Sequence, residues 1–379
     1  MNKHRMNKEL STFAARLREL IANLQSAVSN QQFSELALEL FALQFKRNSA
    51  YQKICEARRL TPQVVEHWSQ IPAVPAAAFK ELELSSLAPG ERTAVFHSSG
   101  TTEQKPSRHF HCAESLELYE TSLWNWFQNQ NLEVSIQKSE LLVLTPPPEQ
   151  APNSSLVHMF ETIRKKLGGA SVPASRTGFF GKLAADGSWT LDFDAVFAVL
   201  VENLITKIEN PKLVLGTAFS FVHLLDFLAE KNLRFQLPEN SRVMETGGYK
   251  NRSRTLPKGE LHSLITKLLG VPAENIICEY GMSELSSQAY DSIDHHPSSI
   301  IHQRVFRFPP WARVQLISPE NGREVANGET GLIRIFDLAN VFSVAAIQTE
   351  DLGVRRGPGF ELIGRAQLAE SRGCSLMTA

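Results

Sequence analysis

The sequence predicts an α/β protein in which helices flank a largely parallel sheet and an antiparallel β block follows. The first observation is an alternation. Between about residues 90 and 290, short apolar runs of strand length alternate with amphipathic segments of helical period, which is the pattern of parallel strands joined by helices. The second is a change after Pro309, where strand-like segments follow one another through turns such as Glu320-Asn321-Gly322. Strands connected so directly pair antiparallel.

The elements can be placed in chain order. Apolar residues recur at helical spacing between residues 8 and 46, which predicts amphipathic helices in an N-terminal region of about residues 1–70. The prolines in residues 71–75 end this pattern. Strands are then expected at residues 93–97, 140–145, 212–217, 242–245 and 275–278. Helices are expected at residues 115–128, 155–167, 193–208, 219–231 and 258–269. The antiparallel block should contain strands at residues 312–317, 331–336, 341–347 and 360–363.

Length and composition narrow the class of protein. The 379 residues can form one large α/β domain or two modest ones. The net charge of −1 gives no basic excess for nucleic acid. Four scattered cysteines without a CxxC pair indicate neither a zinc site nor a disulfide framework. No apolar stretch approaches the ~20 residues that span a bilayer, and the N-terminus lacks the apolar run of a signal peptide. We therefore expect a soluble cytoplasmic protein without membrane insertion.

Polar loops follow three of the predicted strands, at residues 98–102, 246–249 and 279–284. Ligands of open α/β sheets bind outside the carboxyl ends of the strands, so we expect these loops to lie together. The first loop gathers small hydroxylated residues and glycine, which can surround a phosphate. It is not the phosphate loop that ends in Gly-Lys-Ser/Thr, and a surface turn rich in serine, glycine and threonine explains it equally well. The loop at 279–284 adds an aromatic ring, a hydroxyl and a carboxylate.

These loops together suit a nucleoside triphosphate. They supply hydroxyls and backbone donors for phosphate, glycines for a flat ligand, and the carboxylate of Glu284, a group that contacts Mg²⁺ readily. Asp351 adds an acceptor pair suited to ribose hydroxyls.

Four stretches in this order resemble the motif set of the adenylate-forming (acyl-activating) enzymes. They are Ser98-Ser99-Gly100-Thr101-Thr102, Tyr280-Gly281-Met282-Ser283-Glu284, Thr349-Glu350-Asp351 and Gly364-Arg365. Within that superfamily the chain is more similar to the acyl-protein synthetases of the long-chain-fatty-acid luciferin-component ligase (LuxE) type. That closer resemblance rests on residues 97–100, 245–250, 279–288 and 372–375. It covers about residue 90 to the end and implies the N-terminal domain fold of adenylate-forming enzymes.

The resemblance implies that ATP and Mg²⁺ are bound and assigns a role to each matching residue. The β- and γ-phosphates of ATP would be held by Ser98, Ser99, Gly100, Thr101 and Thr102. Ser283 would contact the α-phosphate region, and Glu284 would hold Mg²⁺. Gly247 and Gly248 would border the adenine and acyl sites. Tyr280 would stack on adenine beside Gly281, Asp351 would bind the ribose, and Arg365 would lie near the ribose and phosphates. The carboxylate of the acid substrate would attack the α-phosphate in line and release pyrophosphate.

The C-terminal cysteine is the remaining chemical group in this resemblance. Cys374 stands five residues from the end, in a tail that we expect to be accessible. Thiolates attack activated acyl groups well, and Arg372 can favour the thiolate. The family's acyl acceptor is a cysteine in this position, so the resemblance implies a thioester on Cys374 and a partner acyl reductase that receives the acyl group. Cys55, Cys112 and Cys278 are expected to be small buried hydrophobic residues.

Two departures from the superfamily's pattern leave alternatives open. Glu103 stands where the phosphate loop usually has glycine, and Lys105 precedes Pro106 rather than following it. Fewer than thirty residues follow Asp351, too few for the small C-terminal domain of larger adenylating enzymes. We therefore expect a core at residues 1–352 and an abbreviated segment at 353–379. An acyl- or aryl-CoA ligase, or a non-catalytic nucleotide- or acyl-binding descendant, remains an alternative.

Other polar residues carry weaker signals. His109 and His111 alternate as in a strand, without identifiable metal partners. His295 and His296 precede a proline and are expected to be solvated. The basic cluster of Lys250, Arg252 and Arg254 suits phosphate, a partner protein or plain solvation equally.

Overall fold

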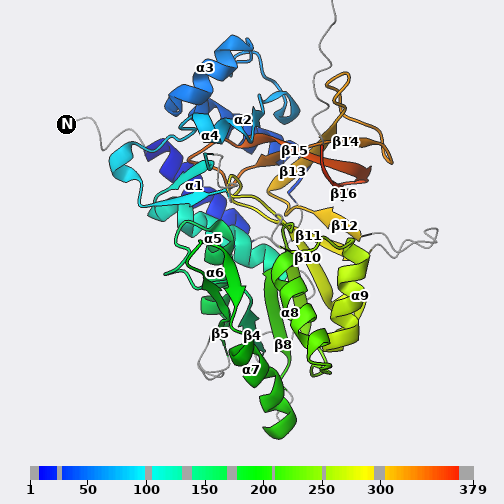
Figure 1. The fold of residues 1–379 in the computed structure, drawn as a ribbon. Helices are drawn as coiled ribbons and strands as arrows, with labels where there is room; N and C mark the ends of the chain where they lie inside the picture. The colour runs from blue at the N-terminus through cyan, green and yellow to red at the C-terminus, as the bar shows by residue number, and fades with distance from the viewer. Residues whose placement is uncertain are drawn as a thin grey trace, which may run out of the picture.

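A computed structural model describes residues 8–23, 28–98, 105–129, 139–168, 177–206, 210–249, 253–293 and 304–366. Its central feature is a 12-stranded sheet in the order β13-β14-β15-β16-β12-β11-β10-β9-β8-β4-β5, with the short β1 (Val74–Pro75) added in parallel to β15. One half of this sheet is parallel and the other half is antiparallel (Figure 1). No helix in the described ranges is long and apolar enough to cross a membrane.

The parallel half confirms the predicted alternation of strands and helices. Its strands are β5 (Gly178–Phe179), β4 (Glu140–Val143), β8 (Lys212–Thr217), β9 (Arg242–Thr246) and β10 (Ile276–Tyr280). All neighbouring pairs among them are parallel. Every residue of β4, β8 and β10 is buried, because helices cover both faces, and this explains the nearly continuous apolar runs.

Successive residues of these strands serve two different cores. Leu141, Val143, Leu213 and Leu215 pack on one face with α5 (Ala113–Gln128) and α6 (Ser155–Leu167). Leu142 and Val214 pack on the other face with α7 (Phe193–Thr206), α8 (Ala218–Glu230) and α9 (Lys258–Leu269). Side chains alternate between the two faces along each strand. This alternation determines on which face each polar residue at a strand end lies.

The antiparallel half joins β10 through β11 (Ala289–Ile293) and β12 (Arg304–Arg307). It continues with β16 (Gly359–Arg365), β15 (Ala346–Arg356), β14 (Thr330–Asp337) and β13 (Ala312–Ile317). The boundary that we expect between residues 352 and 353 lies inside β15. The two-part division of the chain stays a prediction.

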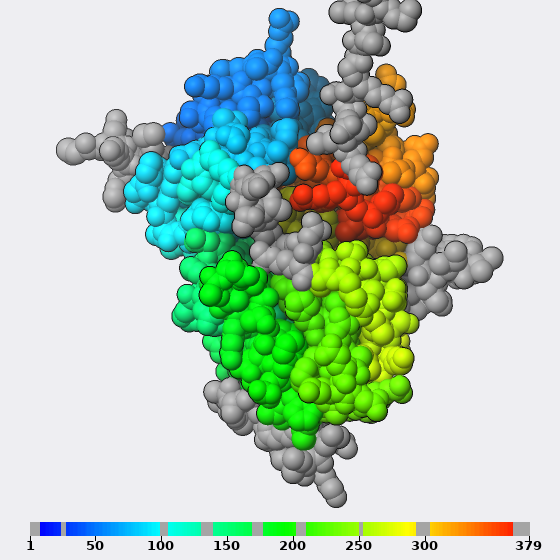
Figure 2. All heavy atoms as spheres, in the orientation of Figure 1, coloured from blue at the N-terminus to red at the C-terminus, as the bar shows by residue number. Residues whose placement is uncertain are grey.

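The N-terminal helices pack against this antiparallel half. They are α1 (Lys8–Ala22), α2 (Asn30–Arg47) and α3 (Ser49–Ala57), and they share one core with β13, β14 and β15. Figure 2 shows the N-terminal residues in blue in the upper half, beside the orange and red C-terminal strands. The green and yellow residues of the parallel half lie below. The two ends of the described chain therefore belong to the same half of the molecule.

Three small elements complete the fold. The short helix α4 (Ala78–Glu81) follows β1. Two further sheets have two strands each: β2 (Ala94–His97) with β3 (Arg108–His111), and β6 (Gly181–Leu183) with β7 (Trp189–Leu191). The first pair corrects an expectation, because β2 is a separate antiparallel ribbon and not a strand of the parallel sheet.

The strand predicted at residues 341–347 is also wrong, since β15 begins only at Ala346. Residues 338–345 form a loop that Asp337 closes, because its N–H donates to the carbonyl of Ala345 at 2.8 Å. The apolar residues Val341, Phe342 and Val344 are buried against the N-terminal helices instead of in a sheet. Gln44 of α2 fixes this position by donating to the carbonyl of Asn340 at 2.7 Å. A short apolar run cannot distinguish these two forms of burial.

Candidate active site

The structure links Ser98, the described residue of the first predicted loop, to Ser283 of the third loop through Ser107. Ser107, just before β3, uses its N–H to donate to the Oγ of Ser98 at 3.0 Å, and its own Oγ lies 3.3 Å from that of Ser283. The antiparallel ribbon therefore presents Ser98 to the loop after β10, although it lies outside the parallel sheet. Ser99, Gly100, Thr101, Thr102 and Glu103 lie outside the described residues.

A buried histidine, His109, contacts the backbone of the loop after β10. His109 Nδ1 lies 2.9 Å from the backbone carbonyl oxygen of Ser283. Burial lowers the pKa of His109 to about 4, so the ring is neutral at pH 7. A carbonyl can only accept, and Nδ1 therefore carries the proton and donates it. No motif pointed to this contact; the only signal was the alternation of His109 and His111 in a strand, which β3 confirms.

Glu284 is a buried carboxylate beside the hydroxyl of Ser283. Its side chain is 5% exposed, and Ser283 Oγ donates to Glu284 Oε2 at 3.0 Å. Among the residues that the structure describes, no lysine or arginine forms an ion pair with it. A buried carboxylate without a cationic partner is unfavourable unless a cation joins it.

These residues fit Mg²⁺. Within the described ranges, no group of three or more histidine, cysteine or acidic side chains could hold a metal ion alone. Mg²⁺ is typically bound by one or two carboxylates together with phosphate oxygens and water. One carboxylate beside a loop that suits phosphate, as at Glu284, is such an arrangement.

Asn340 is a site residue that sequence reasoning missed. Its Nδ2 donates to the backbone carbonyl of Glu284 at 2.8 Å, and its Oδ1 accepts from Ser286 Oγ at 2.6 Å. The neighbouring Asp337 accepts from the N–H of Ser286 at 2.9 Å and the Oγ of Ser287 at 2.8 Å. Burial raises the pKa of Asp337 to about 6 despite these bonds. The end of β14 and the loop after it therefore fix the backbone of residues 284 and 286.

Tyr280, Asp351 and Arg365 also come together, as expected. Tyr280 Oη donates to Asp351 Oδ2 at 2.9 Å, and Arg365 Nε lies 3.8 Å from Asp351 Oδ1. The ring of Tyr280 meets Phe306, Phe308 and Phe360 at steep angles, with centroids 5.3–6.3 Å apart. Arg365 is largely exposed at the end of β16, whereas Asp351 is mostly buried. Burial also raises the pKa of Asp351.

The three glycines of the predicted nucleotide site, Gly247, Gly248 and Gly281, have different surroundings. Gly247 has a φ of +69°, and a Cβ added at Gly247 or Gly248 would meet no atom within 4 Å. These two positions thus border open space, as the edge of a flat ligand requires. A Cβ at Gly281 would collide with the carboxylate of Glu279, so a larger residue there would displace that side chain.

Several other predicted residues lie away from these contacts. Lys105 faces Glu81 with 3.5 Å between Nζ and Oε2, and Arg254 pairs with Asp226 at 2.7 Å. Cys374, His295, His296, Lys250 and Arg252 lie outside the described residues.

The three described cysteines differ in their surroundings. Cys55 and Cys278 are buried as expected, but Cys112 is only half-buried. Cys278 is not a plain hydrophobic residue either, because its Sγ accepts from Lys258 Nζ at 2.9 Å.

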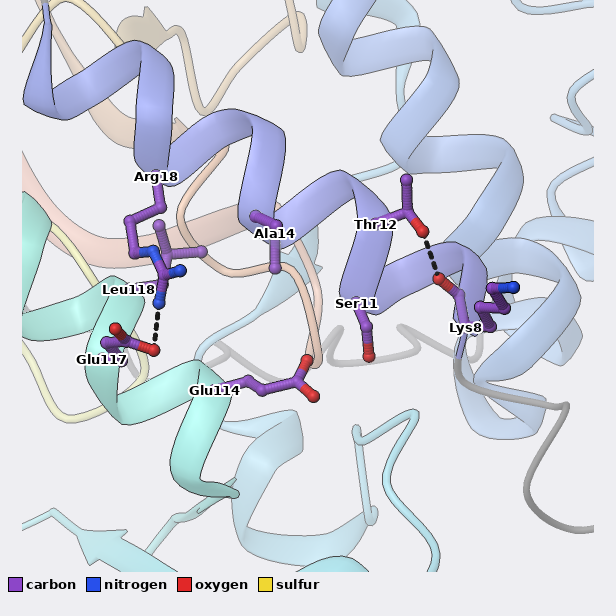
Figure 3. A pocket seen from close by; sticks show the side chains of 9 residues that line it. Lys8, Ser11, Thr12, Ala14, Arg18, Glu114, Glu117 and Leu118 are labelled. Carbon is purple, nitrogen blue, oxygen red and sulfur yellow. Dashed lines mark hydrogen bonds and ion pairs between the residues drawn. The ribbon is translucent and has the colours of Figure 1, made fainter.

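A groove of about 410 Å³ between α1 and α5 lies apart from this site (Figure 3). It is lined by Lys8, Ser11, Thr12, Ala14, Ala15, Arg18, Glu114, Glu117 and Leu118. An ion pair between Arg18 and Glu117 crosses from one helix to the other. None of the predicted site residues lines this groove.

Comparison with known proteins decides the family. The profile of the family described as acyl-protein synthetase, LuxE, matches residues 12–379. The chain belongs to the LuxE family of acyl-protein synthetases. A long-chain-fatty-acid–luciferin-component ligase of Aliivibrio fischeri is 23% identical over 371 residues, which cover 91% of this chain and 87% of the relative. The ligase of the same name from Vibrio harveyi is 22% identical over 361 residues, with the same coverage.

Solved structures agree with the LuxE assignment at the level of the fold. The open conformation of 2-hydroxyisobutyryl-CoA ligase in complex with 2-HIB-AMP and CoA matches with a TM-score of 0.60 and 12% identity. The match covers 89% of this chain and 74% of the ligase. A postadenylation state of the same ligase gives a TM-score of 0.61. This LuxE-family chain therefore has the adenylate-forming fold predicted from its motifs, and the expected enzyme class, an acyl-protein synthetase, is confirmed.

Proposed function

We propose that this protein uses ATP and Mg²⁺ to convert a carboxylic acid into an acyl-adenylate, and then transfers the acyl group to Cys374. The observation that carries the first step is the junction at Ser283 and Glu284, where the Ser98 end of the β2–β3 ribbon meets a buried carboxylate without a cationic partner among the described residues. The carboxylate of Glu284 and the hydroxyls of Ser98 and Ser283 lie near one another there, an arrangement suited to a triphosphate with its metal ion.

Each residue of the junction has a distinct part in this proposal. Ser98 and Ser283 offer hydroxyls to phosphate oxygens, and the His109 and Asn340 hydrogen bonds hold the backbone of residues 283 and 284 in place. Glu284 would hold Mg²⁺, which neutralises charge on the phosphates when bound. Asp351, mostly buried beside Tyr280, would accept from the ribose hydroxyls. Catalysis would then rest on positioning the acid's carboxylate in line with the α-phosphate.

The names of two relatives support the proposed substrate class. Two relatives are named as ligases of long-chain fatty acids and a luciferin component, which supports a long-chain fatty acid as the substrate here. Transfer to the Cys374 thiol, delivery to an acyl reductase partner and a cytoplasmic location remain predictions for this chain. The thioester step balances without a further reagent, because the thiolate sulfur bonds to the acyl carbon and AMP leaves with the electron pair.

The adenylation step is tested by carboxylate-dependent exchange of labelled pyrophosphate into ATP. Saturated fatty acids of graded chain length should support exchange that requires Mg²⁺ and disappears when the acid is omitted. A broad panel of carboxylic acids without any acid-dependent exchange would refute the proposal and favour a non-catalytic binding protein.

The acyl transfer step is tested by labelling the protein itself. Incubation with ATP and a labelled acid should leave a hydroxylamine-labile label on the chain, and Cys374→Ser should remove this label while pyrophosphate exchange continues. The variant Cys55→Ser, at another cysteine far from the tail in sequence, is the matched control. Label retained by the Cys374 variant would contradict the assignment, and turnover that needs coenzyme A would support a CoA ligase instead.

A further inference from the structure

The β2–β3 ribbon ends, beside the candidate site, in a pair of residues that lie directly opposite each other, His97 on β2 and Arg108 on β3. They are the last pair of the ribbon, since Ser98 follows one of them in the chain and Ser107 precedes the other. Ser98 and Ser107 are the two residues that link the ribbon to Ser283. Arg108 therefore lies at the end of the ribbon that meets the candidate site.

The two faces of this ribbon end have different neighbours. Ser107 and His109, two positions apart in the chain, both contact Ser283 and so lie on one face. Arg108 stands between them and lies on the opposite face, where the strand is only half-buried. A triphosphate with its α-phosphate at Ser283 would extend across the end of the ribbon. Its terminal phosphates would then be the ones that approach Arg108.

The guanidinium group of Arg108 is poorly neutralised. Its Nε atom is buried and has no hydrogen-bond partner among the described residues. In the same part of the chain its one ion pair is with Glu83, at 3.6 Å between Nη1 and Oε1, which is too long for a hydrogen bond. Glu83 is bound more closely by Arg92, whose Nη2 lies 2.9 Å from Oε2. Arg92 is also the main cause of the lowered pKa of Glu83, and Arg108 is a minor one.

Lys105, the lysine nearest to Arg108 in the chain, has a carboxylate of its own. Its Nζ lies 3.5 Å from Glu81 Oε2, and the two side chains are 53% and 71% exposed. Arg108 is less accessible, at 29%. A phosphate group attracts a partly buried cation more strongly than an exposed one, because water screens the charge less. Of Arg92, Lys105 and Arg108, the last is therefore the cation best suited to an added anion.

The other member of the pair, His97, is neutral at pH 7. Burial lowers its pKa, and the positive charge of Arg108 lowers it further. A neutral imidazole can still donate one hydrogen bond, so the pair offers one cation and one neutral donor on the same face. Arginine suits such a place, because its planar group binds a phosphate through two parallel hydrogen bonds.

We propose that Arg108, and not Lys105, is the cation that binds the terminal phosphates of ATP and the pyrophosphate that leaves. This inference rests on the proposed function and adds a residue to its site. When an oxygen of the acid's carboxylate bonds to the α-phosphorus, the bond from that phosphorus to the bridging oxygen breaks. The bridging oxygen keeps the electron pair and leaves as part of pyrophosphate. Arg108 neutralises the charge that develops on this leaving group.

Pyrophosphate exchange tests the inference directly, because labelled pyrophosphate is one of the substrates of that assay. Arg108→Gln should raise the KM for pyrophosphate by about 10-fold or more, the loss expected when a hydrogen bond between charged groups is removed. The KM for the acid should stay unchanged. Arg108→Lys keeps the charge without the two parallel hydrogen bonds and should recover part of the loss. Two matched controls, Lys105→Gln and Arg92→Gln, should leave the KM for pyrophosphate unchanged, although Arg92→Gln breaks the closer ion pair of Glu83.

Isothermal titration calorimetry with magnesium pyrophosphate measures the same contact without turnover. The parent protein should bind pyrophosphate, and Arg108→Gln should bind it more weakly by a similar factor. Exchange by Arg108→Gln with the parent's KM for pyrophosphate overturns the inference alone, and so does a larger effect of Lys105→Gln. If binding of pyrophosphate depends on Arg108 but no acid supports exchange, the anion contact stands and the proposed function fails.

Discussion

Glu284→Gln should lower the rate of acid-dependent pyrophosphate exchange by about 100-fold or more, the loss expected when one preorganised electrostatic group is removed from a transition state. The substitution keeps the shape of the side chain and its acceptor for Ser283 Oγ, at 3.0 Å in the parent protein. It removes only the negative charge. The loss therefore reports on the cation that the charge is proposed to hold, and the Mg²⁺ concentration for half-maximal exchange should rise.

The matched control for this substitution is Glu274→Gln, which removes an exposed carboxylate just before β10. It should leave both the exchange rate and the Mg²⁺ requirement unchanged. Thermal unfolding of the Glu284 variant should stay within a few degrees of the parent, because Asn340 binds the backbone of residue 284 and not its side chain. Exchange within 3-fold of the parent at an unchanged Mg²⁺ requirement would remove Glu284 from the metal site.

The parallel half of the fold was predictable because its strands are buried on both faces. Such strands appear as short apolar runs, and the predicted bounds of β8 and α9 agree with the structure. The same signal failed at residues 341–347, where the burial is provided by α2 through a contact with Gln44 across 296 positions of sequence. Local periodicity reports that a segment is buried but not what buries it.

The candidate site shows the same division. Ser283, Glu284, Tyr280 and Asp351 could be named in advance because the chemistry of their types and their order form a motif. The residues that hold this site in place could not be named in advance. Asn340 binds Glu284 across 56 positions of sequence, and His109 binds Ser283 across 174. A hydrogen bond to a backbone carbonyl places little restriction on the sequence around its donor. The residues that hold the site in shape are therefore visible only in the fold.

The same sheet contains a buried ion pair whose removal should have the largest effect on stability. Lys212 and Glu140 lie directly opposite each other on β8 and β4, and their side chains are 0% and 1% exposed. Lys212 Nζ donates to Glu140 Oε2 at the amino ends of the two strands. Lys212→Met should lower the free energy of unfolding by about 3–5 kcal/mol, because it leaves the Glu140 charge buried without its cation. Urea unfolding followed by circular dichroism measures the change.

The double variant Lys212→Met with Glu140→Leu distinguishes two contributions to the free energy of unfolding. One is the stabilisation by the ion pair itself, and the other is the cost of leaving one of its charges buried alone. Both charges are then absent, and apolar side chains of similar volume fill the space, so most of the lost stability should return. The exposed pair of Arg16 and Glu39 provides the matched control, since Arg16→Met should change the free energy of unfolding by less than about 1 kcal/mol. A Lys212→Met protein as stable as the parent would contradict a stabilising role for this ion pair.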